Sequence, residues 1–399
     1  MQRVLSEDMK KQNRIVIYNY IRQNGSQGVT RTEVRLSTGI SGPTILKTFD
    51  FFESRGIISD EGALQRSEPG RRSSIYRFNP GAAFAVGVSY DGQMLRLSLV
   101  NLNYETVTQK NEPLQTSYSS LINEILPQRL PKFTKGYGPI LGAGISLPGI
   151  VNTENRSIRF RSHPTLKTEM EKEDLDADCA ALEKILGFSV RLENDVNSAA
   201  LAEYRARSYG DSEDLVYITL GRGLGAGIVL NGELRRGTHF ACGEIGYILP
   251  GLQSAVNGEM PGRTELEIYK YSLDHYGIDL LTDSPETFPP ELVRHIGDVL
   301  SLVISNLANG LDIQKFALGG FVYEKLGPVL LDDLTQLTEQ TGLLEVELAT
   351  ALCEDGSAQG AASLLIDTKL ESFLSDNFVD SSRDKKPRKN PRKKRNKTK

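Results

Sequence analysis

Hydrophobic residues recur at helical spacing near the amino terminus, and two breaks divide this stretch into three predicted helices. The first covers residues 9–24, and a second starts after Thr30, which stands three residues before Glu33 as in a capping box. A Gly-containing turn at 38–40 precedes a third helix that begins at Ser41. We expect the apolar face of this third helix to hold Ile45, Leu46, Phe49 and Phe52.

Two short strands are predicted next, at residues 57–60 and 74–78, and the loop between them holds Arg66, Arg71 and Arg72. Three helices followed by a two-stranded hairpin are the order of a winged helix-turn-helix, which we assign to residues 1–80 as a DNA-binding domain. A small helical bundle whose basic residues only keep it in solution has the same periodicity. The pattern alone leaves that alternative open.

Side-chain chemistry in this region favours DNA binding. Short residues open the third helix and let its first turn approach base edges, while Lys47 can reach a phosphate. Arg71 and Arg72 follow Gly70, where they could enter a narrow A·T-rich minor groove. The predicted DNA-binding residues are Arg31, Ser41, Gly42, Pro43, Thr44, Lys47, Arg71 and Arg72.

Strand and helix patterns alternate over residues 81–380, which predicts an α/β body with mixed sheets flanked by helices. The predicted strands cover residues 83–88, 95–102, 139–145, 190–193, 215–220, 225–231 and 315–318. The predicted helices cover residues 171–186, 195–208, 291–312 and 359–374. Residues 381–399 form a basic, low-complexity tail that we expect to be disordered.

Composition is that of a globular protein, since 39% of the 399 residues are hydrophobic and 25% are charged. No apolar run approaches the roughly 20 residues that cross a bilayer, and the start lacks a signal-peptide pattern, so we expect a cytoplasmic protein that does not contact membranes. The three cysteines and four histidines have no metal-ligand spacing, and we expect no structural metal.

The net charge of −4 conceals a strong asymmetry along the chain. Residues 1–80 hold 13 basic and 8 acidic side chains, and residues 383–399 hold 11 and 1, whereas the remainder holds 23 and 42. Two basic ends on an acidic body suggest that the ends meet a polyanion. The tail either attracts DNA phosphates or only solvates the chain terminus, and charge alone does not separate these possibilities.

Residues 192–247 combine an Asn194-Asp195 pair at a strand-to-helix turn, a Gly-rich hairpin at 221–227 and Glu244 beyond it. This order resembles the ROK family of sugar kinases and transcriptional repressors, over about three hundred residues. Residues 30–58 and 70–80 are similar to the helix-turn-helix and wing of its sugar-responsive repressor branch. The resemblance implies that the body has the two-lobed, actin-like and ribonuclease-H-like kinase fold.

The resemblance also implies a sugar pocket. Asn194 and Asp195 match the pair that binds ring hydroxyls, with Asp195 at the position of the general base, and Glu244 and Glu267 match two further acids. Tyr247 stands where the family has a histidine and would line the site. Taken singly, Asp195 could instead be a helix N-cap and Glu244 a surface charge.

Two departures from the family pattern argue against catalysis, and a third argues against zinc binding. The first phosphate hairpin reads Ser89-Tyr90-Asp91-Gly92-Gln93 where the family has Asp-x-Gly-Gly-Thr. Arg222 replaces a threonine in the second hairpin, where it is a plug, a surface ion pair or a contact for a phosphorylated ligand. Gly319-Gly320 survives in a third element. Residues 258–265 lack the cysteines of the family's zinc knuckle. We therefore expect no enzyme activity, no zinc and no cofactor.

These features together predict a DNA-binding transcriptional regulator of carbohydrate metabolism, expected to be a repressor, whose catalytically inactive body binds a sugar or sugar phosphate. We expect a dimer or tetramer that binds a palindromic double-stranded operator. Two alternatives stay open. One is a sugar kinase with a DNA-binding head, and the other is a DNA-binding regulator that responds to no ligand.

Overall fold

The computed structural model describes residues 2–25, 27–63, 74–160, 171–207, 213–249, 264–341, 344–353 and 356–378, and the structural statements below refer to these residues. The chain forms two compact units. The first contains residues 1–84 and 136–140, together with the chain from Leu370 onward, and the second contains residues 85–135 and 141–369. Within the described residues, no helix is long and apolar enough to span a membrane.

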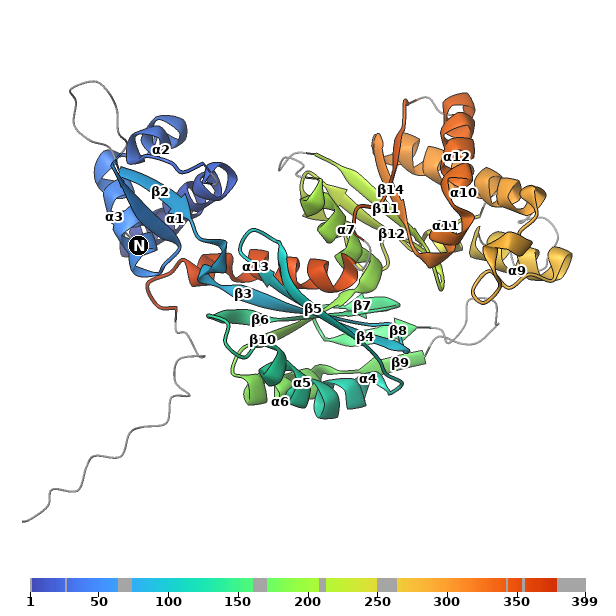
Figure 1. The fold of residues 1–399 in the computed structure, drawn as a ribbon, viewed down its shortest axis with the longest axis horizontal. Coiled ribbons are helices and arrows are strands. Elements are labelled where there is room, and N and C mark those ends of the chain that lie inside the picture. The colour runs from blue at the N-terminus through green and yellow to red at the C-terminus, as the bar shows by residue number, and fades with distance from the viewer. Residues whose placement is uncertain are drawn as a thin grey trace, which may run out of the picture. The chain divides into compact units, whose positions relative to one another are not determined.

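The first unit has the predicted order of three helices and a two-stranded wing (Figure 1). Its elements are α1 (Gln2–Asn24), α2 (Arg31–Thr38), α3 (Gly42–Ser54), β1 (Ile58–Ala63) and β2 (Ser74–Phe78). The strands β1 and β2 pair antiparallel, and Val29 bridges to Tyr76 beside them. Residues 64–73, which hold Arg66, Arg71 and Arg72, lie outside the described residues.

Local capping explains where the helices of this unit begin and end. Thr30 Oγ1 accepts a hydrogen bond from the Glu33 N–H, while the Glu33 carboxylate accepts one from the Thr30 N–H, which confirms the predicted capping box. Gly39 ends α2 in the left-handed region, at φ 70°. Ser41 stands at the N-cap of α3, but its hydroxyl bonds the Thr44 hydroxyl instead of a backbone N–H.

Helix α3 buries a narrower stripe than the sequence predicted. Ile45, Phe49 and Phe52 are buried, but Leu46 is 46% exposed, so its predicted place in the core is wrong. Helical geometry accounts for the error, because a residue next to a buried one is turned by about 100° around the axis. Thr48 takes the fourth place in the buried stripe.

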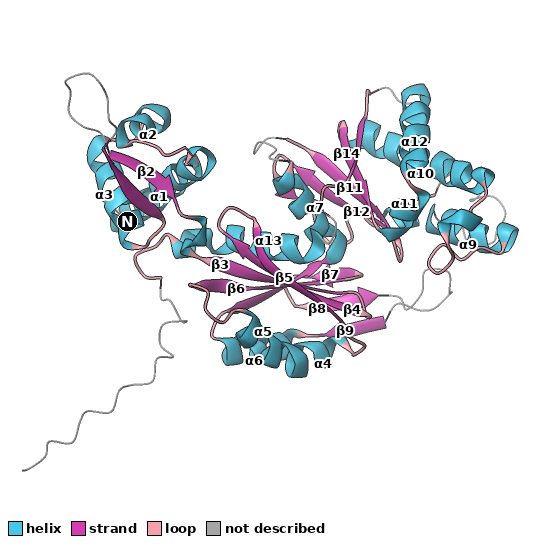
Figure 2. Cartoon of the chain, in the orientation of Figure 1, coloured by secondary structure: helices cyan, strands magenta, loops and turns pink. Residues whose placement is uncertain are grey.

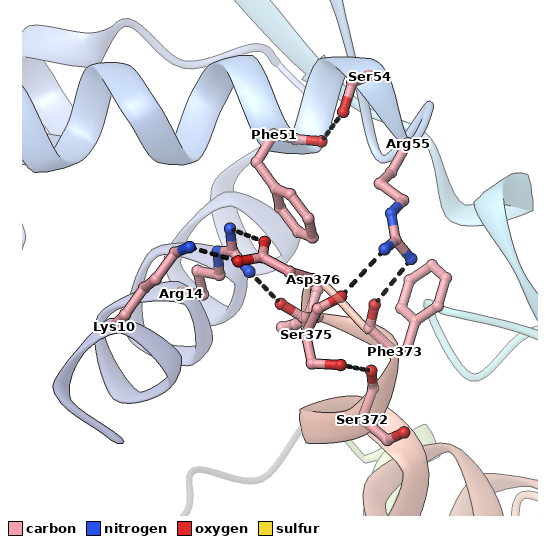
Figure 3. Close-up of polar contacts among 10 residues, drawn as sticks. Lys10, Arg14, Phe51, Ser54, Arg55, Ser372, Phe373, Ser375 and Asp376 are labelled. Atoms are coloured by element: carbon pink, nitrogen blue, oxygen red, sulfur yellow. Dashed lines mark hydrogen bonds and ion pairs between the residues drawn. The ribbon is translucent and has the colours of Figure 1, made fainter. Parts of the chain in front are cut away.

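A carboxyl-terminal segment, residues 370–378, belongs to the same unit as the three helices. Arg14, which is 5% exposed, donates to the Leu374 carbonyl at 2.8 Å and to the Asp376 carboxylate at 2.7 Å (Figure 3). Arg55 donates to the Ser375 carbonyl at 3.0 Å. Hydrogen bonds from Lys10 and Arg14 hold the pKa of the Asp376 carboxyl below its usual value. We call residues 370–378 the C-terminal strap, although the sequence analysis placed them in the body.

The second unit contains three sheets (Figures 1 and 2). The first has the order β10-β6-β3-β4-β5, the second β13-β12-β11-β14-β15, and the third β7-β8-β9. The first is formed by β3 (Phe84–Tyr90), β4 (Met94–Asn101), β5 (Thr106–Pro113), β6 (Ile140–Leu147) and β10 (Ser189–Asn194). The second is formed by β11 (Leu215–Leu220), β12 (Leu224–Leu230), β13 (Glu233–Leu234), β14 (Lys315–Gly319) and β15 (Glu347–Thr350). The third is formed by β7 (Ile150–Asn152), β8 (Ser157–Phe160) and β9 (Glu171–Asp174).

The helices of this unit pack against its sheets and against one another, so the predicted α/β fold is confirmed. They are α4 (Tyr118–Ser120), α5 (Leu126–Phe133), α6 (Asp176–Leu186), α7 (Asp195–Ala206), α9 (Thr264–Tyr276), α10 (Pro290–Leu311), α11 (Phe321–Leu326), α12 (Pro328–Thr341) and α13 (Gly356–Phe373). One predicted helix is too long, because residues 171–174 form an edge strand paired with β8 and the helix starts only at Asp176.

Helix α13 packs against the first sheet where the strands have glycines. It lies on the face of this sheet opposite α5 and α6 (Figure 1). A Cβ built on Gly87 of β3 would stand 1.7 Å from the Ala358 carbonyl oxygen, and one on Gly144 of β6 would stand 2.2 Å from that of Ala361. The other side of α13 approaches α7, where a Cβ on Gly360 would stand 1.7 Å from the Ser198 carbonyl oxygen. Glycine therefore sets the spacing between α13 and both neighbours.

We predict that Gly87→Ala lowers the free energy of unfolding by at least about 2 kcal/mol, because the new methyl group forces the helix off the sheet. Gly310→Ala is the matched control, since Gly310 lies in α10 with no atom within 4 Å of its added Cβ. That change should stabilise the protein by about 0.5–1 kcal/mol through helix propensity. Urea unfolding of the three proteins measures both effects, and equal stability of the parent and Gly87→Ala would refute the close packing.

Candidate functional site

A cleft of about 1260 Å³ opens within the second unit. Its walls contain the residues after β3, the β10-to-α7 turn, the β11–β12 hairpin, the end of β14 and the start of α13. The predicted ligand residues Asn194, Asp195, Glu244 and Tyr247 all line it. The fold thus brings together side chains from widely separated stretches of the sequence, as a ligand site requires.

The β10-to-α7 turn positions two polar side chains at the cleft. Asn194 is the N-cap of α7, because its Oδ1 accepts the Asn197 N–H at 2.8 Å, while its Nδ2 donates to the Gly149 carbonyl at 2.8 Å. Asp195 is the first helical residue and not the cap, which resolves the alternative left open above. Asn194 therefore fixes the turn that presents the Asp195 carboxylate.

Asp195 has the electrostatics of a functional carboxylate. Its Oδ1 accepts hydrogen bonds from the Val196 N–H and from Asn194, and no described residue bonds its Oδ2. Burial, with a smaller contribution from the charge of Asp91, raises the pKa of this carboxyl to about 6, although the hydrogen bonds from Val196 and Asn194 oppose the shift. The charged form of this carboxylate is disfavoured by burial, and one of its oxygens is available. Such a group can bind a ligand hydroxyl or act as a general base.

A residue that the sequence analysis missed, Glu193, supports this turn from behind. Glu193 is 1% exposed and accepts hydrogen bonds from Arg236 at 2.8 Å and from the Asn194 N–H at 3.1 Å. It also accepts from Asn197, so one carboxylate ties the strand, the turn and the helix together. A charged residue at the end of a buried strand, directly before the polar pair, was the available signal.

The far wall of the cleft contains a different acid from the one predicted. Glu265 lines the cleft, whereas Glu267 is not among the described residues that do so. Both lie in the first turn of α9, and a separation of two residues turns their side chains about 200° apart. The Glu267 backbone carbonyl instead contacts His295.

Each glycine hairpin of the cleft has a carboxylate in or beside it. Asp91 accepts the N–H groups of Gln93 and Met94 at 2.9 and 2.8 Å and pairs with Arg96 at 3.0 Å. Although burial opposes it, these bonds hold the pKa of Asp91 below its usual value. In the second hairpin, a Cβ on Gly223 would stand 2.9 Å from a carboxylate oxygen of Glu265.

The two substituted hairpins also contact each other. Arg222 of the second hairpin donates a hydrogen bond to the Gln93 side chain of the first. Each residue stands where the resemblance implies a threonine beside the phosphates. The Arg222 guanidinium thus has a partner within the protein, which argues against the phosphate contact considered for it.

The predicted DNA-binding residues of the first unit are mostly exposed. Ser41, Gly42, Pro43 and Lys47 are exposed at the start of α3, and Thr44 is half-buried there. Arg31 differs, because its guanidinium lies 4.8 Å from the centre of the Tyr76 ring and 3.6 Å from the Asp50 carboxylate.

Two exposed residues near the start of α3 were missed as candidates for DNA contact. Leu46 projects from α3, and the side chain of Arg35 comes within 3.9 Å of a Cβ built on Gly42. Arg35 is exposed and has no ion pair to another described residue. Arg71 and Arg72, the predicted minor-groove residues, lie outside the described residues.

Comparison with known proteins identifies a family, but the relatives within it differ in function. Residues 85–262 match the family model described as ROK family. These residues form a ROK domain. The chain is 27% identical over 300 residues to a glucokinase of Halalkalibacterium halodurans, covering 65% of this chain and 87% of that protein. It is 21% identical over 385 residues to the xylose repressor of Bacillus subtilis, covering 91% of this chain and 97% of the repressor.

A solved structure agrees with the fold over most of the chain. The crystal structure of a ROK family transcriptional regulator, a homologue of the E. coli MLC protein, superposes with a TM-score of 0.72 at 19% identity. It covers 92% of this chain and 98% of that one. The relatives of the ROK domain thus include both kinases and regulators, so family membership alone does not decide between them.

Residues 258–265, which correspond to the family's zinc knuckle, lie mainly outside the described residues, because residues 250–263 are not described. Among the residues that are described, no group of three or more His, Cys, Asp or Glu side chains is placed to hold a metal ion. The absence of zinc stays a prediction that rests on the missing cysteines at 258–265.

We predict that Asp195→Asn raises the free energy of unfolding at pH 7, on the order of 2 kcal/mol, because a raised pKa means that the native protein disfavours the charged carboxyl. The native pKa exceeds the unfolded one, so this cost appears as pH rises from about 4 to about 6. Urea unfolding at pH 4 and pH 7 measures it, and the parent and variant should converge at the lower pH.

Asp91→Asn is the control of opposite sign. The pKa of Asp91 is lowered in the native protein, so its charge stabilises the fold above the unfolded pKa and this benefit is lost as pH falls. The variant should be less stable than the parent at pH 7. A destabilised Asp195→Asn at pH 7 would contradict the assigned cost of the buried charge.

Proposed function

We propose that this protein is a sequence-specific DNA-binding transcriptional regulator, controlled by a sugar or sugar phosphate in a ROK domain that does not transfer phosphate. One observation carries the proposal. The turn that presents Asn194 and Asp195 is fully built, while each hairpin that would hold a nucleotide phosphate has a carboxylate in or beside it, Asp91 at the first and Glu265 of α9 at the second. The Asp91 carboxylate occupies two backbone N–H donors at the first hairpin, and the Glu265 carboxylate beside the second would repel phosphate oxygens.

The first unit supports the DNA-binding part of the proposal. Its α3 begins with exposed, short side chains, followed by Leu46 and Lys47 on the same exposed surface. Polar groups at a helix start can reach base edges, an apolar side chain can contact a thymine methyl group, and a lysine can pair with a phosphate. The match to the xylose repressor extends over 385 residues and therefore includes most of this unit.

The proposed mechanism uses the continuity of helix α13. Gly356 and Ser357 at its start line the cleft, and its last residues, from Leu370 on, belong to the unit that contains α3. Ligand that binds better to one arrangement of the cleft shifts the population of that arrangement, and α13 is the path by which the shift reaches the C-terminal strap. In a homodimer on a palindromic operator, such a shift changes the spacing of the two recognition helices.

A sugar kinase is the second candidate, favoured by the pKa of about 6 at Asp195 and by Gly319 and Gly320, which still line the cleft. A general base without a positioned phosphate contributes little, because phosphoryl transfer depends mainly on positioning and charge stabilisation. The relatives named as kinases keep this alternative open to test.

We predict no sugar-dependent ADP production by the purified protein, measured with ATP, Mg²⁺ and a panel of monosaccharides. The physical reason is the pair of carboxylates at the hairpins, so Asp91→Gly should bind ATP more tightly than the parent because it frees two backbone N–H groups. Sugar-dependent ADP production that disappears in Asp195→Asn would establish the kinase instead.

A separate prediction concerns DNA that the parent protein selects from a random pool. Gly42→Leu should weaken binding to selected DNA at least tenfold more than to scrambled DNA, because the larger side chain stands between α3 and base edges. Lys47→Ala should weaken both about equally and lower the slope of log K against log salt by about one unit. The Arg71/Arg72 double alanine variant should lose preference for A·T pairs beside the site.

Lys184→Ala is the control for charge alone, because Lys184 is exposed on α6 of the second unit. Binding of the selected DNA by this variant should match the parent. Equal losses on selected and scrambled DNA for Gly42→Leu, Lys47→Ala and the arginine variant would mean that the protein attaches by charge only, and the regulator proposal would fail.

A further inference from the structure

The small sheet of the second unit aligns two cations on one face. Arg159 of β8 is the register partner of Ile150 on β7 and of Lys172 on β9, so the three side chains stand side by side across the sheet. Like charges that face each other across neighbouring strands destabilise a sheet. No hydrogen bond or ion pair joins the side chain of Arg159 or Lys172 to another described residue, so their repulsion has no described counter-charge.

These two cations line a pocket of about 320 Å³, which we call the basic pocket. Its described lining contains no Asp or Glu, and consists of Ile150, Asn152, Asn155, Ser157, Arg159, Lys172, Thr238, His239 and Phe240. The glycine hairpins of the cleft contribute none of these residues. The basic pocket is therefore distinct from the position where a kinase would hold nucleotide phosphates.

The two asparagines of the basic pocket are oriented as donors by their own loop. Asn152 Oδ1 accepts the N–H groups of Glu154 and Asn155, at 3.0 and 3.2 Å. Asn155 Oδ1 accepts the N–H and the hydroxyl of Ser157, at 3.2 and 2.7 Å. Each amide oxygen is thus occupied, which leaves the Nδ2 groups to donate to a ligand.

The basic pocket offers hydrogen-bond donors and positive charge, and its described lining has no acidic side chain. This composition indicates which class of ligand it can bind. A guanidinium, an ammonium and two amide N–H₂ groups can surround the oxygens of a phosphate or a carboxylate, and a guanidinium does so with two parallel bonds. A neutral ligand would leave the charges of Arg159 and Lys172 unopposed. The basic pocket is matched to an oxyanion.

Ile150 and Arg159 line both the basic pocket and the cleft, so one ligand can occupy the two together. We propose that the effector is an anionic sugar, whose hydroxyl groups meet the Asn194–Asp195 turn and whose phosphate or carboxylate enters the basic pocket. This inference rests on the proposed function, because it names the ligand class of the same site. It places the anion beside β7–β9 and not at the hairpins of Asp91 and Arg222.

Inorganic phosphate is the first probe, and it tests the pocket without any sugar. Isothermal titration of the full chain should show saturable phosphate binding that weakens at least tenfold in the Arg159→Gln/Lys172→Gln variant. Lys184→Gln, which removes an exposed charge from α6, should bind phosphate like the parent. The melting temperature of each variant without ligand shows whether it is folded. Equal phosphate affinity in the parent and the double variant would overturn the proposal.

The second probe is a set of three matched ligands: a hexose, its 6-phosphate and its uronic acid. The parent should bind one anionic form at least tenfold more tightly than the hexose, and the double variant should bind all three about equally. Which anionic form wins distinguishes phosphate from carboxylate. If the parent lacks this preference but binds the hexose, and Asn194→Ala abolishes that binding, the anionic effector is refuted and the proposed function stands. Binding of no sugar by the cleft would instead refute the proposed function.

Discussion

The close seating of α13 is the constraint on which the cleft depends. Backbone contacts at Gly87, Gly144 and Gly360 leave no room for side chains, so α13 has one place between the first sheet and α7. From there the Ser357 hydroxyl donates to the Asp195 backbone carbonyl at 3.0 Å. The turn that presents the candidate ligand carboxylate is therefore held by α13 as well as by its own cap.

A buried carboxylate strengthens the same junction. Glu203 of α7 is 0% exposed and accepts the N–H groups of Leu352 and Cys353, just before α13, while Arg207 supplies its counter-charge. A buried, fully bonded charge of this kind specifies one arrangement, because any shift leaves it unpaired at a cost of several kcal/mol. Leu352 and Cys353, which line the cleft, are thus fixed to α7.

Local signals in the sequence predicted the fold well, and tertiary context explains the errors. The capping box at Thr30, the Gly39 stop and the Asn194–Asp195 turn depend on neighbouring residues, so they could be read directly. Leu46 was wrongly placed in the core, because hydrophobicity alone does not say which side of α3 faces the other helices. The edge strand at 171–174 has a polar, exposed sequence without alternation, and only its pairing with β8 makes it a strand.

In the candidate site, too, local sequence patterns predicted some residues, whereas contacts between distant segments could not be predicted. Four of the five predicted ligand residues line the cleft, but the helical phase of α9 brings Glu265 there in place of Glu267. The roles of Glu193 and of the Arg222–Gln93 bond could not be read from spacing, since each joins segments far apart in the chain. The strap contacts of Arg14 and Arg55 span more than three hundred residues, beyond any sequence pattern.

The most direct test of the account is whether a sugar bound at the Asn194–Asp195 turn changes the affinity for DNA. Fluorescence anisotropy with selected DNA measures this affinity with and without saturating amounts of each sugar or sugar phosphate that binds. We predict that at least one of them shifts the Kd for DNA tenfold or more in the parent and less than twofold in Asn194→Ala. Asn194→Ser, which keeps a capping hydroxyl, controls for the loss of the cap. Saturating ligand in the cleft with an unchanged Kd for DNA would contradict it.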